Sequence, residues 1–162
     1  MQKKTLKTLE FDKILSMLRL KCGCCVSRET AESLVPFDEL DDVNAELDMT
    51  SEAESFLLRT GNSPVDDFPD MRSALKRMNA VLHLNCEELL NIGRCLKIIR
   101  RCREQLVHES EGASAERLQN IASGLMIHRT VEEEIQRCIL SEDEVFDGAS
   151  PALARIRRQM KL

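Results

Sequence analysis

The stretch LNCEELLNIGRCLKIIRRCREQL, residues 84–106, has the pattern of one long amphipathic helix. Asn85 and Glu88 are spaced as a capping box, in which each side chain bonds the backbone N–H of the other residue. The stretch therefore predicts a helix that starts after Asn85 and buries one face. Apolar residues recur on that face three or four positions apart: Leu89, Ile92, Leu96, Ile99, Cys102 and Leu106.

The same helical spacing recurs on both sides of this stretch, so we expect an all-α fold. Asp38 is expected to cap the helix that follows it, and Gly61 to end that helix. Thr130 and Glu133 form a second capping-box pattern. The other helices are expected at residues 11–18, 26–34, 40–60, 71–78, 118–125 and 130–139, and from residue 150 onward.

The helical spacing fails near residues 139–147, where Val145 and Phe146 stand between acidic residues and Gly148. We expect a short extended hairpin or turn there. Ser150 is suited to cap a helix and Pro151 to its first turn. The chain is therefore expected to form a multi-helix core domain over residues 1–149 and the start of a further helix over 150–162.

Length and composition indicate a globular domain and argue against a membrane-spanning or secreted protein. The chain has 162 residues, 43% of them hydrophobic, which fits one compact domain with a core. No apolar run approaches the roughly 20 residues that span a bilayer. The first residues lack the apolar core of a signal peptide. We expect a cytoplasmic protein without a membrane partner.

The charge pattern argues against a free-standing nucleic-acid binder. The net charge is −5, and residues 36–70 alone hold eleven acidic side chains and one basic one. Phosphate binding favours basic domains, and stacking on single strands favours aromatic side chains, of which the chain has five Phe and no Trp or Tyr.

Two groups of cations nevertheless deserve a functional hypothesis. One lies opposite the apolar face of residues 84–106: Arg94, Lys97, Arg100, Arg101 and Arg103. The other lies at the end of the chain: Arg155, Arg157, Arg158 and Lys161. Each group could contact nucleic acid or a protein partner. Each could instead be a solvated helix face, which is the commoner case for surface helices, and the first group would then oppose the acidic helix 40–60.

The seven cysteines raise the question of a zinc site. Cys22 and Cys25 form a C-x-x-C pair, and His83 and Cys86 are spaced in the same way. Zinc needs four ligands converging tetrahedrally, but these two pairs are far apart in sequence. We therefore interpret the cysteines mainly as small apolar residues and expect no metal ligand.

No pattern of catalytic residues stands out. None of the six glycines begins a G-x-x-x-x-G-K or G-x-G-x-x-G motif, so no cofactor-binding residue is expected. His83, His108 and His128 are scattered, with His108 after a helix end and His128 before a helix start. The carboxylate pairs 41–42 and 66–67 show no sign of the burial that separates pKa values in a catalytic pair. We expect no catalytic residue in this chain.

Four motifs resemble the N-terminal part of the bacterial MutS-two family, the MutS paralogues without a mismatch-reading domain. They are LEFDKIL at 9–15, DMRSALKRM at 70–78, EELLNIG at 87–93 and, the most specific, DGASPALARIRRQM at 147–160. The resemblance implies that the helix from Ser150 begins a lever arm running to a clamp region and back to an ATPase domain followed by an endonuclease domain. The chain would then end within the lever.

The resemblance implies several properties of the parent protein. It would be an ATP-hydrolysing homodimer, using ATP and Mg²⁺, that binds branched DNA and restrains homologous recombination; some members instead act on collided ribosomes. This chain would couple clamp and ATPase mechanically, with the rest of the parent chain as its partner, and have no active site of its own. Two alternatives remain open: a self-contained helical adaptor for a protein partner, and a small helical DNA-binding module.

Overall fold

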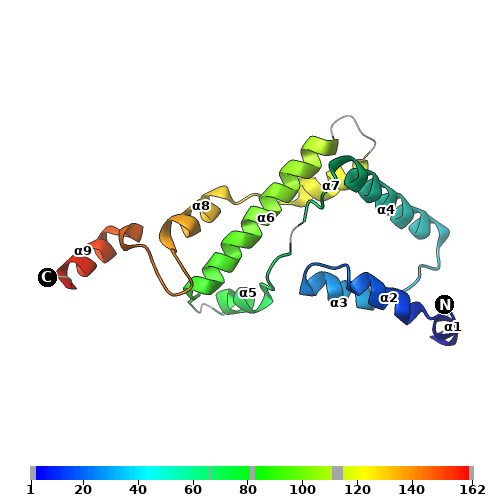
Figure 1. Cartoon of the computed structure of the whole chain (residues 1–162), viewed down its shortest axis with the longest axis horizontal. Coiled ribbons are helices and arrows are strands. Elements are labelled where there is room, and N and C mark those ends of the chain that lie inside the picture. The colour runs from blue at the N-terminus through cyan, green and yellow to red at the C-terminus, as the bar shows by residue number, and fades with distance from the viewer. Residues whose placement is uncertain (1–2, 66, 81–82, 111–114, 161–162) are drawn as a thin grey trace. The chain divides into compact units, whose positions relative to one another are not determined.

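The computed structural model describes residues 3–65, 67–80, 83–110 and 115–160, and confirms the all-α fold in these ranges (Figure 1). Helix α1, Lys3–Thr8, is one that the sequence did not predict. The other elements are α2 Phe11–Arg19, α3 Cys25–Ser33, α4 Leu40–Thr60, α5 Arg72–Asn79, α6 Cys86–Ser110, α7 Glu116–Gly124, α8 Arg129–Cys138, the 3-10 turn η1 Asp147–Ala149 and α9 Pro151–Met160.

The chain divides into two compact units. The first comprises Met1–Asp70 with Cys102–Leu125, and the second Met71–Arg101 with Met126–Leu162. The division falls within α6, so this helix contributes to both units. The core domain over 1–149 with a separate segment 150–162 stays a prediction. Within the described residues, no helix combines the length and apolar character needed to cross a bilayer.

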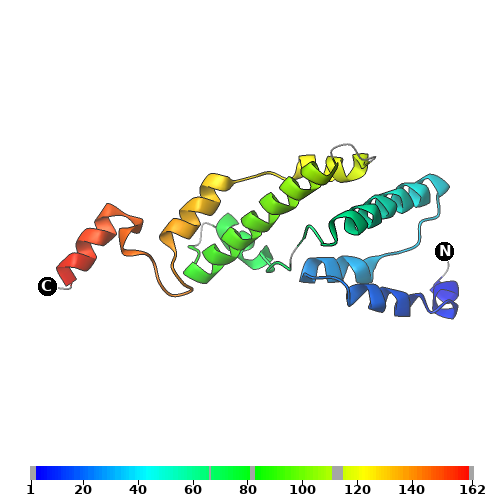
Figure 2. The same ribbon diagram turned by 45° about the horizontal axis from the view of Figure 1, so that its top comes forward.

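The first unit has its core where α4, the end of α6 and α7 meet. Phe56 of α4 is only 3% exposed and belongs to one apolar cluster with side chains from the other two helices. In the same unit, α2 and α3 lie side by side (Figures 1 and 2). The apolar cluster contains Phe56, Cys102, Leu106, Ala115, Leu118 and Ala122, with Leu125 packed against it.

A glutamate of α4 caps the start of α7. The residue before α7, Ala115, has no side chain that can bond the free N–H groups of the first turn. The Glu52 carboxylate accepts them instead, from the backbone of Arg117 at 3.0 Å and of Leu118 at 3.1 Å. The Arg117 guanidinium also lies 2.9 Å from Asp48. These bonds tie α7 to α4.

In the second unit, α8 lies along the first part of α6, as both views show (Figures 1 and 2). Gly93 permits this close approach, because a Cβ atom there would lie 3.2 Å from the Ile135 side chain. Arg100 of α6 forms a two-pronged ion pair with Glu132 of α8, with N–O distances of 3.0 and 2.9 Å. Packing and charge therefore hold the same pair of helices.

The predicted hairpin near 139–147 is confirmed. Ile139 and Val145 form an antiparallel bridge, and the Phe146 N–H donates to the Cys138 carbonyl at 2.8 Å. The final helix also starts as predicted, since the Ser150 hydroxyl accepts the backbone N–H of Leu153 at 3.2 Å. Helix α9 packs against η1.

Two predicted helix boundaries are confirmed. Asn85 and Glu88 form the reciprocal capping bonds, at 2.8 and 2.9 Å. Gly61 ends α4 in the left-handed region, at φ 70°, where its missing Cβ avoids a steric penalty.

Three local predictions are wrong. The N-cap of α4 is Glu39 rather than Asp38; its side chain makes no capping bond, and acidic residues in the first turn suit the positive end of the helix. Thr130 is not the N-cap of α8: the helix begins at Arg129 with His128 as its N-cap, and Arg129 pairs with Glu133 at 2.9 Å. His108 does not follow a helix end, because α6 continues to Ser110.

Candidate functional site

The cations of α9 separate into two kinds. Arg155 and Arg158 are exposed and three residues apart, so they lie on one face of the helix. Arg157 is half-buried and faces the hairpin: its Nη1 donates to the Val145 carbonyl at 2.9 Å and to the Asp147 carboxylate. Lys161, the fourth predicted contact residue, lies outside the described residues. The structure therefore leaves Arg155 and Arg158 as the surface cations of α9.

A second arginine reaches the same turn from α8. The Arg137 guanidinium donates to the carbonyls of Gly148 and Ala149, each at 3.4 Å. It also bonds Glu134 on its own helix, and these bonds hold the pKa of the Glu134 carboxyl below its usual value. Side chains from both flanking helices thus bond the segment 145–149.

The cations of α6 also differ in exposure and in their contacts. Arg94, Lys97 and Arg101 are exposed at spacings of three and four residues, which places them in one stripe. Arg94 donates to the Asn91 side chain on the same helix at 3.3 Å. This stripe remains a candidate contact surface for phosphate groups or an acidic partner.

The other two cations of α6 bond within the protein. Arg103 donates to the Leu125 carbonyl at 2.9 Å, and Arg100 pairs with Glu132, which is 5% exposed. The structure thus places a carboxylate partner of Arg100 in α8. Hydrogen bonds from Arg100 lower the pKa of the Glu132 carboxyl despite its burial, with smaller contributions from Lys97 and Arg129.

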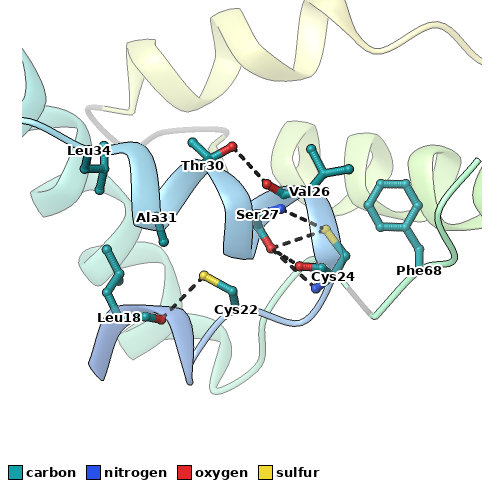
Figure 3. A pocket seen from close by; sticks show the side chains of 9 residues that line it. All are labelled: Leu18, Cys22, Cys24, Val26, Ser27, Thr30, Ala31, Leu34 and Phe68. Atoms are coloured by element: carbon teal, nitrogen blue, oxygen red, sulfur yellow. Dashed lines mark hydrogen bonds between the residues drawn. The ribbon is translucent and has the colours of Figure 1, made fainter. Parts of the chain in front are cut away.

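The Cys22–Cys25 segment forms a turn beside an apolar cavity. Cys24 is the N-cap of α3, and its sulfur accepts the Ser27 backbone N–H at 3.4 Å. The cavity holds about 470 Å³ and lies between α2, α3 and Phe68 (Figure 3). Cys22 also lines it and donates to the Leu18 carbonyl at 3.4 Å. Across the described residues, no three His, Cys, Asp or Glu side chains are grouped so that they could hold a metal ion.

The environments of the cysteines set their reactivity. The Ser27 hydroxyl, 3.2 Å from the Cys24 sulfur, and the Ser27 backbone N–H lower the pKa of the Cys24 thiol. Burial raises the pKa of the Cys95 and Cys102 thiols. Because the thiolate is the nucleophile, these thiols should differ in rate of alkylation.

We expect Cys24 to react with iodoacetamide at pH 7 at least about tenfold faster than Cys102, because its thiolate fraction and its exposure are both greater. Peptide mass spectrometry after timed quenching measures each rate. Ser27→Ala should lower the alkylation rate of Cys24 and leave the rate of Cys102 unchanged. Equal rates at Cys24 in the two proteins would show that Ser27 does not control the thiol.

The histidines and carboxylate pairs considered in the sequence lie in several different elements. His83 lies before α6, His108 in the last turn of α6, and His128 at the N-cap of α8. Asp41 and Asp42 lie in the first turn of α4. In the pair 66–67, the first residue is outside the described ranges, and Asp67 lies near Gly23, where an added Cβ atom would be 3.6 Å from the Asp67 Cα.

The fold and these contacts define an all-helical protein in which charged side chains fix helices to one another and a further set of cations stays on the surface. Almost the whole length of the chain is similar in sequence to proteins named endonuclease MutS2. This similarity confirms the resemblance to the MutS-two family. The chain spans about one fifth of the length of these relatives.

Three relatives illustrate the similarity, each named endonuclease MutS2. Those of Clostridium botulinum (strain Alaska E43) and Ruminiclostridium cellulolyticum are 35% and 36% identical over 161 residues. That of Acetivibrio thermocellus is 36% identical over 162 residues. In each case the match covers 99% of this chain and 20% of the relative. No protein-family profile matches the chain.

Proposed function

We propose that this chain is the helical coupling segment of a MutS2-type endonuclease that acts on branched DNA. The observation that carries the proposal is the match at about 35% identity along 99% of the chain to proteins named as endonucleases. Because the chain spans one fifth of those proteins, the proposal assigns nuclease and ATPase chemistry to the remaining four fifths. The chain itself then has no active site.

The proposal includes properties of the whole protein. It is a cytoplasmic homodimer that binds ATP and Mg²⁺ outside these residues and restrains homologous recombination. Its partners are branched DNA and, through this chain, its own lever, clamp and ATPase parts. Action on collided ribosomes is the other outcome that the experiments below distinguish.

The contacts support a mechanical role. Rigid, well-packed elements transmit displacement because packed interiors deform little. Here α6 is fixed to α8 by Arg100 and Glu132, and α4 to α7 by Glu52. Helix pairs held in this way can pass movement between parts of a larger protein.

The proposal is tested by comparing this chain with the longer protein it implies. The purified 162-residue chain should neither hydrolyse ATP nor cleave a four-way DNA junction, whereas the longer protein should do both. Turnover by the chain alone would refute the proposal. Salt-dependent junction binding by the chain alone would favour a DNA-binding module. Binding of the longer protein to collided ribosomes but not to junctions would favour the ribosome as the target on which the protein acts.

The surface arginines of α9 give a residue-level test. In the longer protein, Arg155→Gln with Arg158→Gln should reduce the slope of log K against log salt for junction binding by about 2, one unit for each lost phosphate contact. Fluorescence anisotropy titrations at several salt concentrations measure the slope. Arg129→Gln, which removes an exposed arginine of α8, is the matched control. An unchanged slope in the double variant would exclude these two arginines as phosphate contacts.

A further inference from the structure

The segment between α8 and α9 is short but densely bonded. The hairpin is closed by the Leu140 N–H to the Glu144 carbonyl at 2.9 Å and by the Phe146 N–H to the Cys138 carbonyl at 2.8 Å. The Ala149 N–H then returns to the Phe146 carbonyl at 2.9 Å. The connection from α8 to α9 is therefore a defined structure rather than an open loop.

The Phe146 ring adds packing to these backbone bonds. A Cβ atom at position 148 would lie 2.7 Å from Cε1 of that ring, so glycine allows the ring to sit against the backbone of the turn. Any larger residue would require the ring to move.

Two arginines bond this turn from its two flanking helices. Arg157 of α9 reaches Val145 and Asp147, and Arg137 of α8 reaches the carbonyls of Gly148 and Ala149. A guanidinium suits this use, because its fixed fork of donors can bond several acceptors at once.

We infer that Arg137 and Arg157 together fix the direction of α9 relative to α8, so Arg157 is a positioning residue and not a contact for nucleic acid. We call the segment 145–149 with these two arginines the α8–α9 joint. The mechanical consequence of the joint rests on the proposed function. Through it, movement of α8 is passed to α9, and Arg155 and Arg158 are held on the outward face.

The ion pair of the joint contributes little to the free energy of unfolding. Side chains of Arg157 and Asp147 are 32% and 47% exposed, so solvent screens their attraction. Helix α9, however, has ten residues, and an isolated helix of this length is marginal in water. Contacts that anchor its first turns therefore decide whether it stays ordered and aligned.

The test measures the orientation of α9 by NMR in the full 162-residue chain. With the joint intact, amide residual dipolar couplings of α8 and α9 should fit one alignment tensor, with backbone order parameters of about 0.85 in both helices. Arg157→Gln should require a second tensor for α9 and lower its order parameters below about 0.6, while α8 stays unchanged. Arg155→Gln, two residues away on the exposed face, is the control.

A charge exchange separates positioning from general damage to the fold. Asp147→Arg combined with Arg157→Asp should restore much of the alignment lost in Arg157→Gln, which a merely structural defect would not allow. A single tensor and unchanged order in Arg157→Gln would overturn the inference. Loss of alignment in Arg155→Gln to the same degree would also overturn it, because the effect would then not belong to the joint.

A second measurement tests the mechanical role of the joint separately from its effect on the direction of α9. In the longer protein, Arg157→Gln should leave basal ATP hydrolysis unchanged and abolish its stimulation by branched DNA. Loosened α9 with normal stimulation would refute the mechanical role while the joint itself stands. If stimulation by DNA is lost while α9 stays aligned with α8, the loss is not caused by a loosened joint, and the inference is overturned.

Discussion

Replacing Glu132 by alanine is expected to lower the free energy of unfolding of the second unit by about 3 kcal/mol. Glu132 is 5% exposed, and its two carboxylate oxygens accept both prongs of the Arg100 guanidinium. Without the carboxylate, the cost of removing water from the partly buried Arg100 guanidinium is no longer offset by the buried ion pair. The expected loss is several times that of a surface ion pair.

The measurement is urea unfolding followed through the amide signals of α6 and α8. Glu133→Ala is the matched control: it removes the neighbouring carboxylate, which pairs with Arg129 on the exposed face, and should cost at most about 0.5 kcal/mol. The double variant Arg100→Met/Glu132→Leu should recover much of the loss, because an apolar pair leaves no unpaired charge. Similar losses for Glu132→Ala and Glu133→Ala would contradict the importance of the buried pair.

The same ion pair predicts a pH dependence. Arg100 holds the pKa of Glu132 in the folded protein below the value of about 4.3 expected for an unfolded chain. Between these two pKa values the unfolded state binds more protons, so stability rises with pH in this window. The contribution is complete above about pH 5 and is lost as pH falls through the lowered pKa. The gap in stability between the natural protein and Glu132→Gln should therefore narrow on acidification.

The sequence predicted the helices because their apolar spacing is a local property. The periodic face of residues 84–106 and the Asn85–Glu88 capping box needed no knowledge of the tertiary structure. The two wrong boundaries are the N-caps of α4 and α8, which are Glu39 and His128 rather than Asp38 and Thr130, and neither the Glu39 nor the His128 side chain makes a capping bond. Helix α1 was missed because its six residues, KKTLKT, contain one large apolar side chain.

The charged contacts were harder to predict because they depend on which helices meet. The run 132–134 is three identical residues in sequence, yet the first is buried against α6 and the second lies on the surface. Helical spacing could have indicated this, since Glu132 shares a face with the buried Ile135 three positions later. Likewise, Arg157 could be told from Arg155 and Arg158 only once the turn at 145–149 was placed.

Glu52 carries the other large expected effect. Its carboxylate is the acceptor for two backbone N–H groups at the start of α7, and its side chain is 13% exposed. A negative charge at that position also interacts favourably with the positive end of the helix. Glu52→Ala should therefore destabilise the packing of α7 on α4 by about 2 kcal/mol, the upper range for loss of a helix cap.

Glu52→Gln separates the two contributions, because the amide oxygen still accepts hydrogen bonds but carries no charge. It should lose about half as much stability as Glu52→Ala. Glu54→Ala, two residues along on the exposed side of α4, is the control and should cost little. Hydrogen exchange at Arg117 and Leu118 gives the local readout, since both amides should lose protection in Glu52→Ala. If these two amides keep their protection, the first turn of α7 is held by something other than Glu52, and α4 does not cap it.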